Sequence, residues 1–297
     1  MPETKHAIVL GATSLVGAFL CERLAAAGYT GECISRNPSA NHSRPQLPFC
    51  WRRLDVQNPD DWQASPGAVV VSLLPLWALP QLLSRLQDVR QIIAVSTTSV
   101  FTKAHSADPE ERDLVNRTLR SEQALLRFCT RARLDWTILR PTLVYGAGRD
   151  RNISAIARFA RRFGVFPVAR PACGLRQPIH ADDVAQAIVA SIDNPRARNE
   201  AFNLTGGETL TYRDMVRRIF EAAGRRPVIV ALPSWLLSLV LRLARLVSRS
   251  LYSPALFDRM NQDLTFDSSA ARAALGFDPR PFFPEFDDSA SRREGRV

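Results

Sequence analysis

The fold is decided by residues 6–17, which read HAIVLGATSLVG. His6–Leu10 is a short apolar run typical of a β-strand, and it meets Gly11 directly. A helical pattern of apolar residues then occupies residues 15–27 and ends at Gly28. This pattern predicts the first βα unit of the fold, because a strand leads through a glycine turn into a helix that ends at a glycine.

Short apolar runs and helical patterns alternate along the first half of the chain. The runs that predict strands lie at residues 6–10, 32–35, 49–54, 68–74, 91–96 and 136–139, and residues 114–132 predict a long helix. Such alternation is typical of a parallel sheet with helices on both faces. We therefore predict an α/β fold built on a Rossmann-like, doubly wound parallel sheet.

Residues 11–17 form the glycine turn between the first strand and the first helix. Backbone N–H groups and the dipole at a helix start favour a pyrophosphate. Gly11 allows the bend, and Gly17 lets the helix and the strand approach closely. Ser14 stands where such turns usually have a middle glycine, and its side chain could either hydrogen-bond a phosphate or crowd it. We predict a dinucleotide site, with a purely structural turn as the alternative.

The end of the second predicted strand indicates which dinucleotide is bound. An acid at this place accepts from the ribose 2′-OH of NAD, whereas an arginine accommodates the 2′-phosphate of NADP. Arg36, with Ser35 as a second donor, therefore favours NADP(H) over NAD(H). The alternative is an ordinary surface arginine, since the chain has 39 basic residues of which only Lys5 and Lys103 are lysines.

After residue 145 the pattern becomes α+β, with helices predicted at residues 152–163, 182–192 and 212–223 and strands at residues 201–204 and 228–232. We predict that residues 1–145, with roughly 177–206, form the dinucleotide-binding domain. Residues 146–176 and 207–297 are then a smaller α+β substrate or cap subdomain.

The composition is that of a globular protein, with 46% hydrophobic and 23% charged residues. The net charge of +10 could indicate nucleic acid, a membrane surface or an anionic ligand. The basic residues form no tail and do not alternate with aromatic ones, so we expect a solvated surface and no nucleic-acid partner. The five cysteines show no metal-ligand spacing, which indicates no metal and reduced, mostly buried thiols. A polar start without a signal-peptide pattern predicts a cytoplasmic protein.

Six further motifs follow the glycine turn in order, over about 200 residues of the chain: LDV at 54–56, SLLP at 72–75, VSTTSVF at 95–101, LRPTLVYG at 139–146, QPIHADDVA at 177–185 and FNLTGGE at 202–208. With these motifs the chain resembles the short-chain dehydrogenases/reductases. The resemblance is to the extended and atypical members grouped with NAD-dependent epimerases/dehydratases. It implies an oxidoreductase or an epimerase/dehydratase-type enzyme acting on a polar, nucleotide-sugar-like small molecule.

The resemblance also implies roles for individual residues. Asp55 faces the adenine, residues 73–75 cover the adenosine, and Pro141 lies beside the nicotinamide. Thr97 occupies the catalytic Ser/Thr position and polarises a hydroxyl. The predicted cofactor-binding residues are Gly11, Thr13, Ser14, Leu15, Val16, Gly17, Ser35, Arg36, Asp55, Val56, Leu73, Leu74, Pro75, Ser96, Pro141 and Leu143.

That family's catalytic pair, a tyrosine and a lysine four residues later on one helix, is absent from the sequence. In the pair, the lysine charge lowers the pKa of the phenol, which then exchanges a proton with a substrate hydroxyl. Here Tyr29, Tyr145, Tyr212 and Tyr252 are followed four residues later by Cys33, Arg149, Val216 and Leu256. If Glu122 corresponds to the glutamate downstream of the pair, Leu114 and Thr118 hold the two expected positions.

Three alternatives follow from the missing pair. The chain could use another acid or base, with Lys103 as the candidate and a solvated loop lysine as its alternative. It could be a non-catalytic NADP(H)-binding sensor or assembly subunit, or it could have lost its chemistry. We predict that His180 is a structural residue at a helix start rather than a base, with Asp182 or Asp183 as the N-terminal charge of that helix.

Two features of the second half concern partners. In the nucleotide-sugar enzymes that the chain resembles, an arginine just before the IH motif holds the substrate diphosphate, and Arg176 stands at that place. Residues 235–251 predict a basic amphipathic helix. Such a helix can lie in a bilayer interface at the inner membrane face or pack on the domain, and we favour packing. A homodimer is a further expectation that the sequence leaves open.

Overall fold

A computed structural model describes residues 5–38, 47–59, 62–150, 152–233, 236 and 259–286 of the chain. Its centre is a seven-stranded sheet in the order β11-β6-β5-β4-β1-β2-β3, and every neighbouring pair of strands is parallel. The predicted doubly wound parallel sheet is therefore confirmed. Its strands are β1 (His6–Leu10), β2 (Thr30–Ser35), β3 (Phe49–Arg53), β4 (Val69–Ser72), β5 (Gln91–Val95), β6 (Asp135–Pro141) and β11 (Glu200–Leu204).

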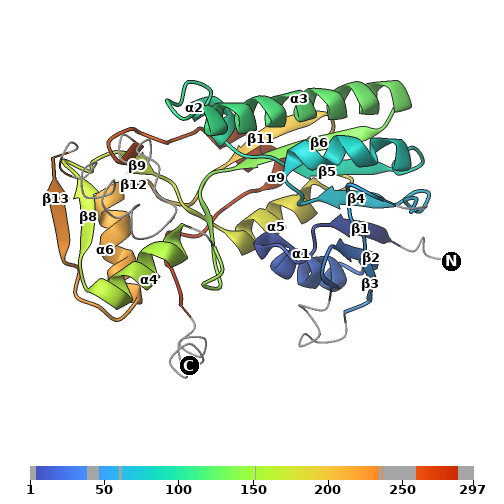
Figure 1. Ribbon diagram of the computed structural model, residues 1–297. Coiled ribbons are helices and arrows are strands. Elements are labelled where there is room, and N and C mark those ends of the chain that lie inside the picture. Colours follow the sequence, from blue (N-terminus) through green and yellow to red (C-terminus); the bar gives the residue numbers. More distant parts are fainter. Residues whose placement is uncertain are drawn as a thin grey trace.

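Helices cover both faces of this sheet (Figure 1). On one face lie α1 (Leu15–Ala26), α5 (Ala181–Ser191) and the short α9 (Ser269–Leu275). On the other lie the 3₁₀-helix η2 (Leu76–Arg85) and α3 (Pro109–Ala132), which the four-residue α2 (Ser99–Thr102) precedes. Successive valines of β4 point into the two opposite cores, which explains the continuous apolar run in this central strand.

A smaller lobe stands beside the sheet, at the left of Figure 1. It contains α4 (Ile153–Phe163), α6 (Tyr212–Ala222) and the parallel pair β8 (Phe166–Ala169) and β13 (Ile229–Leu232). These elements share a third apolar core. Two further short pairs complete the described strands: β7 (Val144–Tyr145) with β10 (Ile179–His180), and β9 (Leu175–Arg176) with β12 (Leu210–Thr211).

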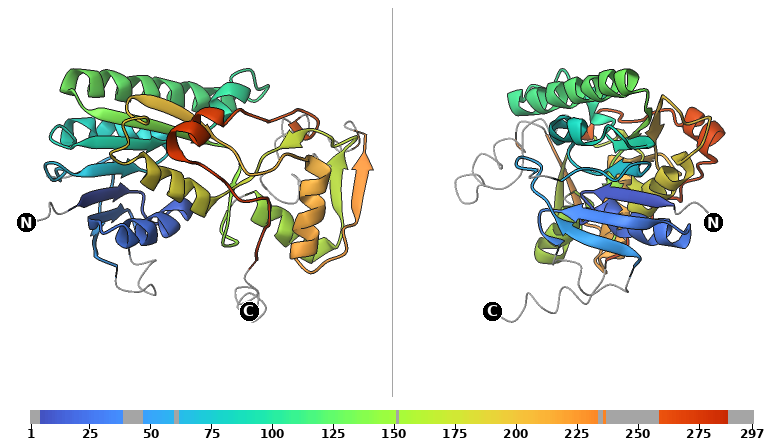
Figure 2. Two further views of the ribbon diagram at one scale, coloured as in Figure 1. Left: turned by 180° about the vertical axis from the view of Figure 1, so that it is seen from behind. Right: turned by 90° about the vertical axis from the view of Figure 1, so that its right-hand side faces the viewer.

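The chain after α9 joins the two cores. Phe277 lies in the core shared by α1 and α5, whereas Phe282 is only 1% exposed and lies in the core of the smaller lobe. Figure 2 shows this segment running from α9 to the smaller lobe. The predicted boundary assigns residues 207–297 to the smaller subdomain, but α9 itself packs on the large sheet.

The start of α3 differs from the sequence prediction, because the helix begins at Pro109 rather than near residue 114. Asp108 caps it, accepting from the Glu110 N–H at 3.0 Å, and Pro109 takes the first helical position. These signals lie in a polar stretch, outside the apolar periodicity on which the prediction rested.

Two other predictions concern the environment of the chain. Within the described ranges, none of the helices has the length and apolar character to cross a bilayer. The helix predicted at residues 235–251 lies outside those ranges except for Leu236. Three of the five thiols, Cys21, Cys33 and Cys129, are buried, as the sequence predicts for most of them.

Candidate functional site

The candidate site lies at the edge of the sheet where its parallel strands end. The N–H groups of Gly11 and Ala12 donate to the Ile34 carbonyl of β2, at 2.9 and 3.1 Å. On the other side of β1, the Leu73 N–H donates to the Leu10 carbonyl at 2.8 Å. The Leu54 N–H bonds the Ser35 carbonyl at 3.1 Å. The glycine turn, the end of β2, the segment after β3 and the loop after β4 are therefore direct neighbours.

Close packing explains the two glycines of the turn. Gly11 has φ +79°, and a Cβ added there would lie 3.1 Å from the Leu73 carbonyl carbon. A Cβ on Gly17 would lie 2.3 Å from the Ala12 carbonyl oxygen. Both positions therefore require glycine, one for its backbone conformation and the other for the approach of α1 to the turn.

Ser14 acts as the N-cap of α1, since its Oγ accepts from the Gly17 N–H at 3.1 Å. A hydroxyl that accepts in this way keeps its own proton for another acceptor, such as a phosphate oxygen. A tight turn that leads into a helix start is an arrangement that binds pyrophosphate in other proteins. The residues present thus fit a dinucleotide.

The ends of β2 and β3 carry the residues predicted to select the cofactor. Ser35 is buried and its Oγ accepts from the Asn37 N–H at 3.0 Å, while Arg36 is exposed. Asp55 is also exposed, and it accepts from the Gln57 N–H at 3.1 Å. An exposed guanidinium next to the glycine turn is available for an anionic group.

At the same edge of the sheet, the ends of β5 and β6 bring together Thr97, the predicted catalytic residue, and Pro141, predicted to lie beside the nicotinamide. The Thr98 N–H donates to the Pro141 carbonyl at 3.1 Å, so Thr97 and Pro141 lie close to each other. Thr97 is half-buried, and its Oγ1 accepts from the Ser99 N–H at 3.1 Å. As with Ser14, this leaves the hydroxyl proton of Thr97 able to polarise a substrate oxygen.

Beneath this segment lies an ion pair that the sequence did not predict. Glu122 of α3 is 5% exposed and binds Arg140 through two hydrogen bonds, of 3.0 and 2.6 Å. Ser96 donates to the same carboxylate at 2.6 Å. In the sequence, Glu122 stands on the otherwise apolar face of a predicted long helix. A charged residue at such a position indicates a buried partner of opposite charge. The network fixes the end of β5, from which the chain continues to Thr97.

The two positions expected to hold the family's Tyr and Lys lie one turn apart on α3. Leu114 is 43% exposed and carries no titratable group. The Thr118 hydroxyl donates to the Leu114 carbonyl at 2.8 Å, within its own helix. Neither side chain can replace a phenol activated by a lysine.

Lys103 is held by an acidic neighbour. Its Nζ lies 3.0 Å from Glu111 Oε1, and Glu111 also binds Ser106 at 2.7 Å and Arg259 at 2.5 Å. Although burial raises the pKa of Glu111, the bonds from Arg259, Ser106 and Lys103 outweigh it and lower the pKa to about 2. As a proton donor, Lys103 would have to leave this cluster, and its catalytic role stays a prediction.

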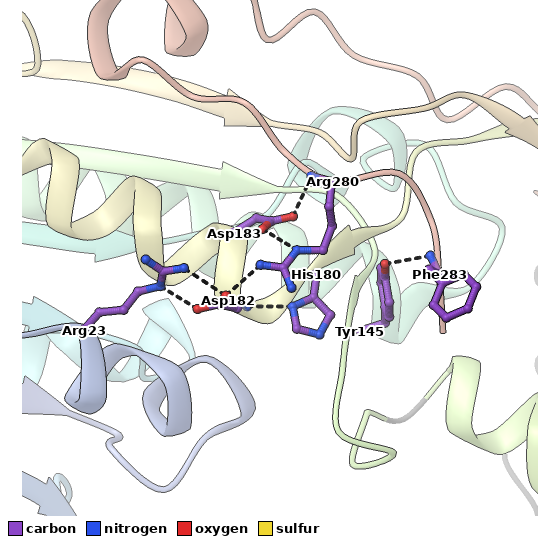
Figure 3. Close-up of polar contacts among 7 residues, drawn as sticks. All are labelled: Arg23, Tyr145, His180, Asp182, Asp183, Arg280 and Phe283. Atoms are coloured by element: carbon purple, nitrogen blue, oxygen red, sulfur yellow. Dashed lines mark hydrogen bonds and ion pairs between the residues drawn. The ribbon is translucent and has the colours of Figure 1, made fainter. Parts of the chain in front are cut away.

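His180 is the N-cap of α5 and directly precedes its first residue, Ala181 (Figure 3). Its Nδ1 accepts from the Asp182 N–H at 3.2 Å, and burial lowers its pKa, so the ring is neutral with its proton on Nε2. The predicted hydrogen-bonding position of His180 at the start of a helix is thereby confirmed. Asp182 and Asp183 occupy the first turn of α5, as the sequence predicts.

These two aspartates form a charged network with arginines from distant segments (Figure 3). Asp182 binds Arg23 of α1 at 2.5 and 2.9 Å and Arg280 at 2.6 Å. Asp183 binds Arg280 at 2.8 Å. The segment after α9 is thus fixed to the start of α5.

The next residues of that segment attach to the smaller lobe. The buried Tyr145 accepts from the Phe283 N–H through its hydroxyl at 3.2 Å, and burial raises the pKa of this phenol. Tyr145 therefore has a packing role at the junction between the lobes.

Arg176, predicted to hold a substrate diphosphate, lies in a buried position. It donates to the carbonyls of Leu175 and Gln262 at 2.7 Å each and to that of Arg259. Its guanidinium stacks on Tyr212, 5.3 Å from the ring centre, and burial lowers its pKa to about 10. To bind a diphosphate it would have to give up these carbonyls, and the predicted role stays a prediction.

The fold and its glycine turn define a Rossmann-like α/β protein with an additional smaller lobe. Residues 79–205 match the sequence profile of the NAD dependent epimerase/dehydratase family. The resemblance inferred from the sequence motifs is thereby confirmed for this segment.

Three individual proteins are similar to the chain. The UDP-glucose 4-epimerase of Vibrio cholerae is 24% identical over 54% of this chain and 46% of its own. The "NADH dehydrogenase [ubiquinone] 1 alpha subcomplex subunit 9, mitochondrial" of Arabidopsis thaliana is 27% identical over 40% of this chain and 29% of its own. The chain thus spans less than half of the length of these two relatives. The structure of MoeE5 in complex with UDP-glucose and NAD superposes with a TM-score of 0.68 at 20% identity, covering 93% of this chain and 94% of MoeE5.

Proposed function

We propose that the chain binds a nicotinamide dinucleotide at the glycine turn and acts as an epimerase-type oxidoreductase on a nucleotide-sugar-like small molecule. The observation that carries this proposal is the packing of residues 11–17 between β2 and the loop after β4. This packing presents the start of α1 to the edge where the strands end. The match to the epimerase/dehydratase family supports this proposal. The structure of MoeE5, which is in complex with UDP-glucose and NAD, also supports it.

The cofactor in this proposal is NADP(H) rather than NAD(H). Arg36 is exposed beside Ser35 at the end of β2, where the 2′-phosphate of NADP is bound in folds of this kind. NADPH should therefore bind more tightly than NADH. Arg36→Ala should reduce the preference about 10-fold, through weaker NADPH binding, in fluorescence titrations. Arg213→Ala, which removes an exposed arginine of α6, is the matched control. A wild-type preference for NADH would contradict this choice of cofactor.

When bound, the dinucleotide supplies hydride transfer to and from a carbon atom of the substrate. In the proposal, Thr97 polarises the hydroxyl on that carbon through its available proton. Thr97→Val should then abolish turnover of UDP-glucose or a related UDP-sugar while leaving NADPH affinity within about twofold, since the hydroxyl acts on the substrate. Product formation followed by chromatography tests this, and equal turnover in the variant would contradict it.

A second candidate function is that of a non-catalytic dinucleotide-binding subunit. It is favoured by Leu114 and Thr118 at the expected Tyr and Lys positions and by the ion pair of Lys103 with Glu111. The relative in Arabidopsis thaliana, named as a subunit of NADH dehydrogenase, points the same way. Tight NADPH binding without turnover of sugar nucleotides or quinones, unchanged by Thr97→Val or Lys103→Ala, would favour this candidate.

A further inference from the structure

Arg149 lies against the glycine turn although 136 residues separate it from Thr13. Its Nη2 is 3.5 Å from the Thr13 carbonyl oxygen, and its side chain is exposed. This distance is at the long limit for an N–H···O bond, which is usually near 2.9 Å. A guanidinium has five N–H donors, and this weak contact uses one. The position brings an exposed positive charge to the place proposed for the pyrophosphate.

The backbone around Arg149 is held firmly on its N-terminal side. The Arg149 N–H donates to the Gly146 carbonyl at 3.2 Å, which closes a tight turn. Ala147 and Gly148 have φ of +48° and +62°, the signs that a type I′ turn requires. A Cβ on Gly146 would lie 3.0 Å from His180 Nε2, so this turn packs directly on the start of α5. Figure 1 shows the loop after β7 extending beside α1.

On its C-terminal side, Arg149 precedes the cap of α4. Asp150 is buried, and its Oδ1 accepts from the N–H groups of Asn152, Ile153 and Ser154, at 3.1, 2.6 and 3.0 Å. Hydrogen bonds therefore hold the residues on both sides of Arg149, whereas its side chain is exposed. Fixing the backbone in advance reduces the entropy cost of binding an anion.

The glycine turn itself has fewer available donors than its shape suggests. The Ser14 N–H donates to the Gly11 carbonyl at 2.9 Å, and the Gly17 N–H donates to Ser14 Oγ at 3.1 Å. Two backbone N–H groups at the start of α1 therefore already donate to acceptors within the turn. A pyrophosphate with two negative charges gains from a further cationic donor, and a guanidinium can bind phosphate oxygens in pairs.

We propose that Arg149 is a phosphate-binding residue, which leaves the Thr13 carbonyl and binds the pyrophosphate of the dinucleotide at the glycine turn. This inference rests on the proposed dinucleotide binding. Because Arg149 comes from the loop that leads into α4 of the smaller lobe, the contact also joins that lobe to the cofactor.

Binding of two probes by the full chain tests the proposal. ADP-ribose has the pyrophosphate but no nicotinamide, whereas adenosine has no phosphate. Arg149→Ala and Arg149→Gln should weaken ADP-ribose binding about 10- to 100-fold in calorimetric titrations, the range of a charged hydrogen bond. Arg149→Lys should keep part of the affinity, and adenosine affinity, followed by NMR, should not change. Arg213→Ala is the matched control, and equal melting temperatures verify that the exposed side chain is not needed for folding.

Three results would overturn the proposal. Normal ADP-ribose affinity in Arg149→Ala and Arg149→Gln would remove the phosphate role and leave dinucleotide binding intact. An equal loss of ADP-ribose and adenosine affinity would show a displaced loop instead of a lost phosphate contact. Absence of both NADPH and ADP-ribose binding in the wild type would overturn this inference together with the proposed function.

Discussion

Arg23, in the last turn of α1, forms a two-bond ion pair with Asp182, in the first turn of α5 (Figure 3). The two residues are 159 positions apart in the sequence. The hydrogen bond from Arg23 lowers the pKa of Asp182, so the carboxylate is ionised at neutral pH. The positive charge of Arg23 lies near the C-terminal end of α1, and the negative charge of Asp182 lies near the N-terminal end of α5. The helix dipoles stabilise both charges at these ends. The pair thus fixes how the helix of the glycine turn lies against α5.

We expect a double-mutant cycle on this pair to give a coupling of about 1–2 kcal/mol in urea unfolding. The side chains of Arg23 and Asp182 are 35% and 20% exposed, so water screens the pair less than a surface pair. Asp182→Ala should destabilise more than Arg23→Ala, because Asp182 also binds Arg280. The control cycle is Arg90 with Asp193, at 41% and 48% exposure, for which we expect about 0.5 kcal/mol or less. Equal couplings in the two cycles would contradict the stabilising role of the Arg23 pair.

Gly17→Ala should destabilise the chain by about 3 kcal/mol or more. The new methyl group would lie 2.3 Å from a backbone oxygen, and a helix cannot move aside as a flexible side chain can. Gly28→Ala is the matched control, since its Cβ meets nothing within 4 Å and only its φ of +80° is unfavourable, at a cost of about 1 kcal/mol. Chemical denaturation measures both, and a smaller effect at Gly17 than at Gly28 would contradict the packing argument.

Stability should depend on pH through Glu111. Its pKa in the folded protein is about 2, below the ordinary value of 4.5, so the ionised carboxylate stabilises the fold above pH 4.5. That contribution is lost as the pH falls from about 4.5 to about 2. Glu111→Gln should therefore lower the melting temperature at pH 7, where it leaves Lys103 and Arg259 without their shared anion. The difference between variant and wild type should shrink towards pH 2. A difference independent of pH would exclude the charge as its cause.

The sequence alone determined the local features of the site. The apolar run before Gly11 and the helical pattern after it predict the first βα unit, because strand and helix periodicities are properties of neighbouring residues. The same reasoning placed His180 at the start of a helix, since a capping side chain acts within a few residues of its own position. Apolar periodicity alone missed the early start of α3, because its Asp108 and Pro109 signals lie in a polar stretch. It also could not pair Glu122 with Arg140, because these two residues lie on different elements.

Only the tertiary structure decided which charged residues meet. The sequence offers arginines throughout the chain, and nothing local distinguishes Arg23, Arg149 or Arg280 from the other arginines. Their partners Asp182, Thr13 and Asp183 lie about 100 or more residues away, and they become neighbours only when the folded chain packs these distant segments against one another. An ion pair or a phosphate contact requires atoms within about 4 Å, a distance that the fold sets and the order of residues does not.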